Sequence, residues 1–299
     1  MIATTVRLLS LMPLSINRHI GAALGHLAWA LNGSLRRITL INLALCYPKL
    51  TEKERTAIAK ASLLHTGRSL TESSWIWLRN PNKLMMRARI AQGEALFEEA
   101  LASEHGLLIA TPHIGNWEAL NTVIARNHSM TYMYRPPRAI WLEPLFLRWR
   151  ANFNAEPARL DASGLRQVLK KLRNGQIVGV LPDQEPDLQN GVFAPLFGIP
   201  TNSMTLVQKL ATRGQAKVLF CVCERESGSL FPMRKSGWVV SFLEPETAIF
   251  DADPVIAATA MNKAVEQCIA LNPEQYLWSY KRFNLLPEGG RRNYKSPRA

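Results

Sequence analysis

No stretch of this 299-residue sequence is apolar for long enough to form an unmistakable membrane-spanning helix. The run 20–35 near the N-terminus has no Asp, Glu, Lys or Arg, but it still contains His26 and Asn32. A spanning helix takes about 20 apolar residues. No small-x-small site closes a compact apolar core, so a cleavable signal peptide is not indicated. The pattern favours a segment lying on a membrane surface, and the alternative is a buried helix of a soluble protein.

Acidic residues are scarce, and none occurs before Glu52. The chain has 36 Lys and Arg against 23 Asp and Glu, which gives a net charge of +13. The surplus gathers at the two ends, where the tail after Tyr280 holds a single acid among the cations Lys281, Arg282, Arg291, Arg292, Lys295 and Arg298. This balance predicts an acidic partner, which can be an anionic membrane, a phosphorylated substrate, an acidic protein or nucleic acid.

Two common catalytic patterns are missing. The four cysteines include no CxxC pair, and the alternation of Cys221 and Cys223 in an apolar run predicts two core residues on one face of a strand. The pattern G-x-S-x-G is also absent. Its absence argues against a serine acyl-enzyme and favours direct attack by a substrate hydroxyl.

Helix-like and strand-like segments alternate after residue 50. Apolar residues recur at helical spacing from Thr51 to Leu78, and Thr51 with Glu54 predicts a capping box. Short apolar runs predict strands at 107–111, 130–134, 177–181, 217–223 and 238–243. Further helices are predicted at 116–125, 141–153, 163–173 and 254–271. This alternation indicates the α/β class with a mixed, largely parallel sheet flanked by helices.

The motif that carries most chemistry is His113-Ile-Gly-Asn-Trp-Glu118, between a strand-like run and a helix start. Residues five apart on one helix lie about 140° apart, so the pair cannot act from a single regular helix. With His113 in the turn and Glu118 in the first helical turn, the two side chains converge, and Asn116 is a suitable N-cap. Glu118 would then hold one imidazole nitrogen while the other removes a hydroxyl proton. The alternative is a loop histidine beside an exposed glutamate.

Several blocks share one order and spacing with a known family. The blocks are Arg37–Asn42, Cys46-Tyr47-Pro48, Thr51–Arg55, Pro112–Glu118, Met133-Tyr134-Arg135-Pro136, Val180-Leu181-Pro182-Asp183-Gln184, Gly191–Gly198 with Pro200-Thr201, and Tyr276–Phe283. Together they resemble the late, or secondary, acyltransferases of lipid A biosynthesis, within the HxxxxD/E lysophospholipid-acyltransferase-like superfamily. The resemblance covers nearly the whole chain.

The resemblance implies a fold, a reaction and a location. It implies one glycerolipid-acyltransferase-like domain over 36–299, preceded by a membrane-associated segment over 1–35. The implied reaction moves a fatty acyl chain of the laurate or myristate class from acyl carrier protein to a hydroxyl of a lipid A precursor. It implies no metal or redox cofactor, because the acyl carrier protein thioester is a co-substrate that is already activated. The implied partners are acyl carrier protein, the precursor and an anionic membrane, at the cytoplasmic face of a bacterial inner membrane, with no nucleic acid.

The resemblance and the positions of single residues also imply roles. His113 is expected to be the general base and Glu118 its orienting partner. The expected substrate-binding residues are Asn116, Arg135, Arg150 and Asp183, and the expected acyl-pocket residues are Phe193 and Phe197. Arg135 would bind a phosphate of the acceptor or the phosphopantetheine of the donor. Asp183 would position Arg135 or the acceptor sugar; surface charges and ordinary loop packing are the alternatives.

Three other functions stay open. A lysophospholipid or phosphatidylinositol mannoside acyltransferase would carry the same motif. A nucleic-acid-binding protein would suit the charge, but no zinc-finger spacing or RNP-like aromatic block is present. A catalytically inactive membrane scaffold would need no base at His113.

Overall fold

The computed structural model describes residues 2–125, 127–137, 139–151, 154–226 and 237–295. Its α-helices are α1 (Ile2–Leu11), α2 (Leu14–Ala30), α3 (Ser34–Cys46), α4 (Glu52–Leu78), α5 (Pro81–Met85), α6 (Glu94–Leu101), α7 (Trp117–Ala125), α8 (Glu143–Arg150), α9 (Ala162–Arg173), α10 (Leu206–Gly214) and α11 (Pro254–Leu271). Its strands are β1 (Ala88–Gln92), β2 (Leu107–Ala110), β3 (Met130–Tyr134), β4 (Ala155–Arg159), β5 (Ile177–Val180), β6 (Gly191–Leu196), β7 (Ile199–Met204), β8 (Lys217–Arg225) and β9 (Trp238–Leu243).

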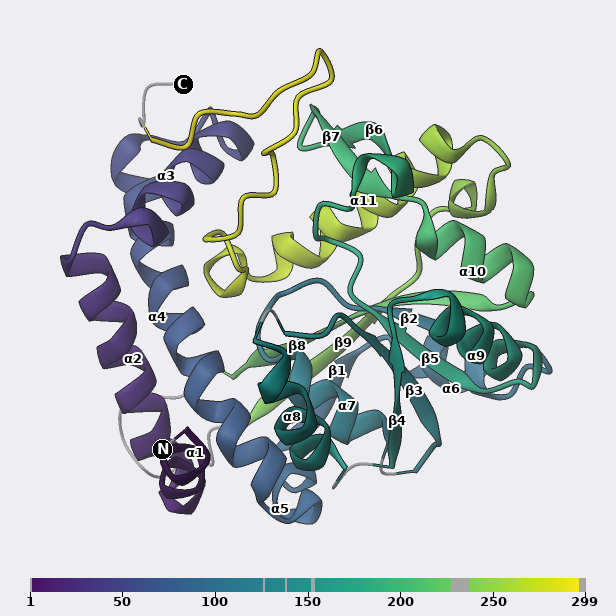
Figure 1. Cartoon of the computed structure of the whole chain (residues 1–299), viewed down its shortest axis with the longest axis horizontal. Helices are drawn as coiled ribbons and strands as arrows, with labels where there is room; N and C mark the ends of the chain where they lie inside the picture. Colours follow the sequence, from purple (N-terminus) through teal and green to yellow (C-terminus); the bar gives the residue numbers. More distant parts are fainter. Residues whose placement is uncertain (1, 126, 138, 152–153, 227–236, 296–299) are drawn as a thin grey trace.

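One mixed sheet organises the domain (Figure 1). Within the described ranges its order is β1-β9-β8-β2-β5-β3-β4, and a separate hairpin pairs β6 with β7. All neighbours in the large sheet are parallel except β8 and β9. The predicted α/β class and largely parallel sheet are therefore confirmed. The central strand β2 is buried along its whole length, as expected for a parallel strand covered on both faces.

Helices cover both faces of this sheet. On one face, Leu108 packs in a core with side chains of α9, α10 and α11. On the other face, Leu107 packs with side chains of α4, α6 and α7. Neighbouring strand residues point to opposite faces, so one short run supplies both cores. The sheet is thereby fixed from both sides, and its carboxyl edge is free to carry a site.

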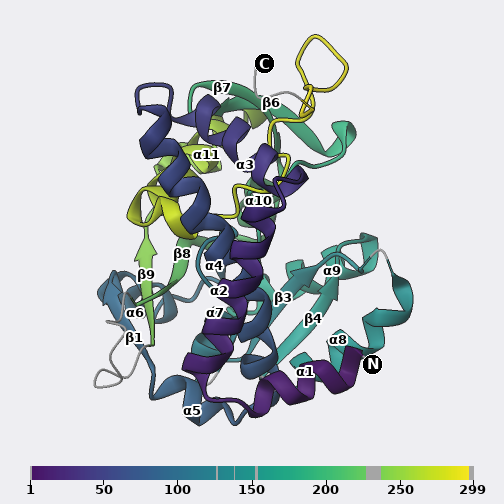
Figure 2. The ribbon, with the colours of Figure 1, turned by 90° about the vertical axis from the view of Figure 1, so that its left-hand side faces the viewer.

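The N-terminal helices pack against the domain along α4 (Figure 2). Gly21 and Gly25 of α2 lie against Gly67 of α4, where a Cβ on Gly67 would stand 2.0 Å from the carbonyl oxygen of Gly21. Only glycine allows the two backbones to approach so closely. At the next turns, buried Arg18 of α2 forms an ion pair with Glu72 of α4. Helix α2 is therefore an integral part of the packed structure.

The exposed side of α2 carries a stripe of large apolar side chains. Leu24, Leu27 and Leu31 are 44%, 54% and 71% exposed, and Ile16 lies on the same stripe at 50%. Monomeric soluble proteins rarely expose large contiguous apolar patches. Among the described residues, every helix is too short or too polar to cross a membrane.

Candidate active site

The His113 turn follows β2 and is held by main-chain hydrogen bonds. Gly115 has φ +62°, and a Cβ there would stand 2.1 Å from the carbonyl oxygen of Cys223, so the position requires glycine. The Gly115 N–H donates to the Gln275 carbonyl at 3.1 Å, and the Asn116 N–H donates to the Cys223 carbonyl at 2.7 Å. The turn is thus fixed between β8 and the segment that follows α11.

These bonds change the role expected for Asn116. Its side-chain oxygen accepts from the Ala119 N–H at 3.2 Å, which confirms the predicted cap at the start of α7. Its side-chain nitrogen donates to Glu72 at 2.8 Å, and the residue is 1% exposed. Asn116 therefore lies beneath the site, where it cannot contact substrate, and its N–H and that of Gly115 are already used.

His113 is paired with Asp183, which stands just beyond the end of β5. The Asp183 carboxylate lies 2.7 Å from the His113 Nδ1 and accepts from the His113 main-chain N–H at 2.8 Å. Burial alone would raise the pKa of Asp183, but the adjoining histidine ring and these hydrogen bonds lower it below its ordinary value. An ionised acceptor at Nδ1 places the proton there and leaves the lone pair on Nε2.

Glu118 has other partners. Its carboxylate accepts from the Trp77 Nε1 at 2.8 Å and forms an ion pair with Arg150 that includes a 3.1 Å bond from the Arg150 Nε. Burial lowers the pKa of Arg150, but the Glu118 carboxylate more than offsets this and raises it. The expected hydrogen bond from the His113 ring to the Glu118 carboxylate is therefore corrected: the ring bonds to Asp183 and Gln184 instead. The first turn of α7 directs Glu118 toward α4 and α8, while Asp183 approaches the histidine from the neighbouring strand.

A buried charge cluster supports the turn from α4. Glu72 is fully buried and accepts from Arg225 at 2.8 Å, from Asn116 and from Arg18. Burial would raise the pKa of Glu72, but the two guanidinium groups outweigh it and lower the pKa to about 2. A single carboxylate thus connects helix α2, strand β8 and the catalytic turn.

A cavity of about 670 Å³ opens beside His113. It lies where β3 and β5 separate. These two strands pair only as far as Tyr132 and Gly179, whereas β3 stays paired with β4 up to Tyr134. A Cβ on Gly179 would stand 3.0 Å from the Met130 side chain, so the absence of a side chain keeps this part of the cavity open. The site therefore occupies the carboxyl edge of a parallel sheet, the usual place for ligands in α/β folds.

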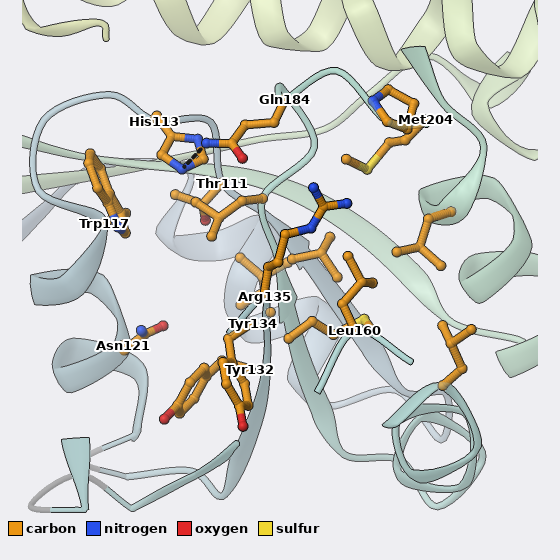
Figure 3. Close-up of a pocket in the computed structure, with 18 of the residues that line it drawn as sticks. Thr111, His113, Trp117, Asn121, Tyr132, Tyr134, Arg135, Leu160, Gln184 and Met204 are labelled. Carbon is orange, nitrogen blue, oxygen red and sulfur yellow. Dashed lines mark hydrogen bonds between the residues drawn. The ribbon is translucent and has the colours of Figure 1, made fainter. Parts of the chain in front are cut away.

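The labelled lining residues surround the centre of the cavity (Figure 3). His113, Trp117 and Thr111 lie at one end beside Gln184, whose side-chain nitrogen is 3.2 Å from the His113 Nε2. Tyr132 and Asn121 line a second part, and Leu160 and Met204 line a third. The Arg135 guanidinium points into the centre, and within the described part of the chain it has no hydrogen-bond or ion-pair partner.

Of the remaining expected site residues, some line the cavity and others do not. Arg135 and Arg150 line the cavity, as expected of substrate-binding residues, although Glu118 already holds Arg150. Asp183 is 3% exposed and acts on His113 rather than on the cavity. Phe197 packs on Tyr47 and Trp278, with ring centroids 5.4 and 6.0 Å away.

Phe193 lies on β6, and neither it nor Phe197 lines the cavity. The acyl-pocket role is therefore not supported for this aromatic pair. No group of three or more His, Cys, Asp or Glu that could hold a metal ion occurs among the described residues, where all four cysteines are buried and free.

The sequence did not predict the roles of two residues of the site, Gln184 and Glu72. Gln184 directly follows Asp183 in one of the quoted blocks, so its position at the strand end was a signal that could have found it. Glu72 gave no such signal, because its partners Arg18 and Arg225 are 54 and 153 residues away in sequence.

Comparison with known proteins identifies the family. A family model described as bacterial lipid A biosynthesis acyltransferase matches residues 1–284. The chain is 28% identical to the lipid A biosynthesis lauroyltransferase of Escherichia coli, covering 93% of this chain and 88% of that protein. It is 27% identical to a lipid A biosynthesis acyltransferase of Haemophilus influenzae, covering 93% and 87%.

The lipid A biosynthesis myristoyltransferase of Escherichia coli is 25% identical, covering 96% of this chain and 87% of that protein. A solved 1-acyl-sn-glycerophosphate acyltransferase of Thermotoga maritima aligns with a TM-score of 0.37 at 11% identity, covering 80% and 93%. The family match spans almost the entire sequence, in agreement with the motif blocks. The chain therefore belongs to the bacterial lipid A biosynthesis acyltransferases.

Proposed function

We propose that this chain transfers a fatty acyl group from an acyl carrier protein thioester to a hydroxyl of a lipid A precursor. The pairing of His113 with Asp183 beside a large cavity is the observation that carries the proposal. A histidine whose Nδ1–H is held by a carboxylate presents a basic Nε2. Family membership supports the lipid A precursor as acceptor.

The chemistry needs one base and no metal or redox cofactor, because a thioester is already an activated acyl donor. The His113 Nε2 takes the proton from the acceptor hydroxyl as its oxygen attacks the thioester carbonyl carbon. The tetrahedral intermediate then collapses, the carbon–sulfur bond breaks, and the imidazolium returns the proton to the leaving thiolate. The products are an ester and the free thiol of the carrier.

Gln184 is the best-placed group for the developing oxyanion. In the free site its amide nitrogen donates to the His113 Nε2 at 3.2 Å, at the position that the acceptor hydroxyl takes during the reaction. When the acceptor hydroxyl binds to the His113 Nε2, it displaces the Gln184 amide from that nitrogen. The amide then donates to the thioester oxygen. The Gly115 and Asn116 N–H groups are excluded from this role because carbonyls of the protein already occupy them.

The apolar part of the cavity, between α7 and the strands β3 and β5, suits the acyl chain. Its walls are Ile109, Leu120, Ile124, Met130 and Tyr132, and an acyl chain gains about 0.8 kcal/mol for each buried methylene group. Arg135, which lines the cavity and has no partner among the residues that the structure describes, suits a phosphate of either substrate.

The exposed stripe on α2 suits the surface of an anionic membrane, and we place the protein at the cytoplasmic face of the bacterial inner membrane. Its leucines would enter the lipid interface, while exposed Arg7 meets the head groups. The absence of any acid before Glu52 removes repulsion from anionic lipids. A lipid acceptor would then reach the cavity without leaving the membrane.

A mass-resolved transfer assay tests the function. Purified protein in detergent is given a panel of acyl carrier protein thioesters and a tetra-acylated lipid A precursor. We expect a product heavier by one acyl group, lost in His113→Ala and kept in His105→Ala, a control at an exposed histidine. Failure of every donor with folded protein would overturn the proposal and direct attention to lysophospholipid or glycolipid acceptors.

A further inference from the structure

Helices α9 and α10 form a basic surface at one end of the molecule. Together they carry six cations and no acid, namely Arg166, Lys170, Lys171, Arg173, Lys209 and Arg213. The two helices pack against each other, and the Arg173 Nε donates to the Arg213 carbonyl at 3.1 Å. We call the outward face that they share the α9–α10 surface.

Most of these charges have no partner in the part of the chain that the structure describes. Lys171 forms an ion pair with Glu156 at 2.9 Å. By contrast, Arg166, Lys170, Lys209 and Arg213 are exposed, and their charged groups have no hydrogen-bond or ion-pair partner among the residues that the structure describes. Like charges held together repel each other, so a cluster of this kind favours an anionic partner.

The α9–α10 surface adjoins the catalytic cavity. Both helices begin at the carboxyl edge of the sheet, and Leu165 of α9 and Lys209 of α10 line the same cavity as His113. A partner seated on the surface would therefore stand at the mouth of the cavity. A flexible prosthetic arm from such a partner would enter past these two residues.

The surface lacks the features of a lipid-binding face. Helices α9 and α10 expose no large hydrophobic side chain along their described lengths, whereas an interfacial helix needs an apolar face to enter lipid. Figure 1 places α9 and α10 at the opposite end of the long axis from α1 and α2. If the α2 stripe rests on a membrane, the α9–α10 surface faces away from it.

We infer that the α9–α10 surface is the docking site of an acidic carrier protein, which presents the acyl thioester to the cavity from the side opposite the apolar stripe. This inference rests on the proposed function and assigns its donor partner to particular residues. Such docking is dominated by charge complementarity, which raises the rate of encounter and weakens with salt. The basic C-terminal tail is not part of this docking site.

The test compares two donors that share one acyl chain. One is the acyl carrier protein thioester and the other is the acyl-pantetheine thioester, which lacks the protein. The variant combines Arg166→Glu, Lys170→Glu and Arg213→Glu, none of which lines the cavity. The matched control, Lys53→Glu with Lys60→Glu, reverses exposed charges on α4. Each protein is assayed at low and high salt, and its binding to vesicles of anionic lipid is measured by sedimentation.

The expected result is a rise of at least tenfold in KM for the carrier-bound donor, with KM for the pantetheine donor unchanged and a weaker salt dependence. Equal KM values for the variant and the unmodified protein would overturn the docking site while leaving the transferase intact. Loss of vesicle binding with an unchanged donor KM would show a lipid face instead. If the unmodified protein uses neither donor, the proposed function itself fails.

Discussion

The side-chain nitrogen of Asn116 lies 2.8 Å from the Glu72 carboxylate, and this bond joins the catalytic turn to the buried charge cluster beneath it. Asn116 caps α7, which carries Glu118, and it stands three residues after His113. Glu72 also forms an ion pair with Arg18 of α2. The geometry of the site therefore depends on a helix near the N-terminus that contributes nothing to the cavity lining.

Glu72→Gln should be strongly destabilising. The change leaves Arg18 and Arg225 buried without a countercharge, and breaking a buried ion pair costs about 3–5 kcal/mol. Urea unfolding monitored by circular dichroism measures the loss. Glu226→Gln is the control, because Glu226 pairs with Arg89 at the surface, where an ion pair contributes about 1 kcal/mol or less. Equal losses in the two variants would contradict the structural role of the cluster.

Asp183→Asn should slow the chemical step with little change in KM. General-base catalysis contributes about 10²–10⁴-fold, and without the carboxylate the Nδ1–H tautomer of His113 is no longer enforced. Steady-state kinetics measures the fall in kcat, and NMR of ¹⁵N-labelled histidine reports the tautomer. Glu118→Gln is the matched comparison. We expect the tautomer to persist in that variant, and its loss there but not in Asp183→Asn would reverse the assignment.

Gly179→Leu should shift donor preference toward shorter acyl chains. A side chain at this position projects toward Met130 and Tyr132 and fills the apolar part of the cavity. Each methylene group excluded from the pocket forfeits about 0.8 kcal/mol of binding. Competition assays with mixed thioesters measure the preference, and Gly179→Ala should give a smaller shift in the same direction. A uniform loss for all chain lengths would place the acyl chain elsewhere.

The stability of the protein should fall as the pH drops below 6.5, because of His65. Burial, together with Arg225 and Arg68, lowers its pKa from 6.5 to about 3. The unfolded chain therefore binds a proton that the folded protein rejects, and the unfolding free energy falls by about 1.4 kcal/mol per pH unit from pH 6.5 down to pH 3. Urea unfolding at pH 7.5 and 5.5 checks this. In His65→Gln we expect a shallower slope, and an unchanged slope would exclude His65 as its source.

Leu24→Asn combined with Leu27→Asn should weaken binding to anionic vesicles without lowering stability. Both side chains are on the exposed stripe of α2, where Leu24 is 44% and Leu27 54% exposed. Vesicle sedimentation measures binding, and thermal unfolding checks the fold. Leu63→Asn is the contrasting variant, because Leu63 is 2% exposed and its replacement should unfold the protein instead. Undiminished vesicle binding by the α2 variant would remove the stripe from the interface.

Elements with a strong local pattern were predictable from the sequence. The capping box of Thr51 and Glu54 opens α4 as expected, and α11 spans the predicted 254–271. Edge strands were missed because they are half-exposed and polar, as in β4 with its Glu156 and Pro157. Such strands form through pairing with a neighbour, and a local hydrophobic pattern does not reveal them.

Several residues that the sequence placed at the candidate site lie together in the structure, but their pairings were not predictable. His113, Glu118, Arg135, Arg150 and Asp183 all fall near one sheet edge, because the carboxyl ends of parallel strands meet there. The identity of the histidine's partner could not be derived, since Asp183 lies 70 residues away in sequence and Glu118 only five. Spacing measures proximity along the chain, whereas hydrogen bonding depends on the direction of each side chain.

The glycine contact between α2 and α4 bears on how a more soluble version of this protein can be obtained. Deleting residues 1–35 would remove the apolar stripe, but it would also expose Gly67 and strip Arg18 from Glu72. A shortened protein would then fail in the assay for reasons unrelated to lipid. Polar substitutions on the exposed side of α2 separate the loss of lipid contact from the loss of packing. They alter the contact with detergent and leave α2 packed against α4.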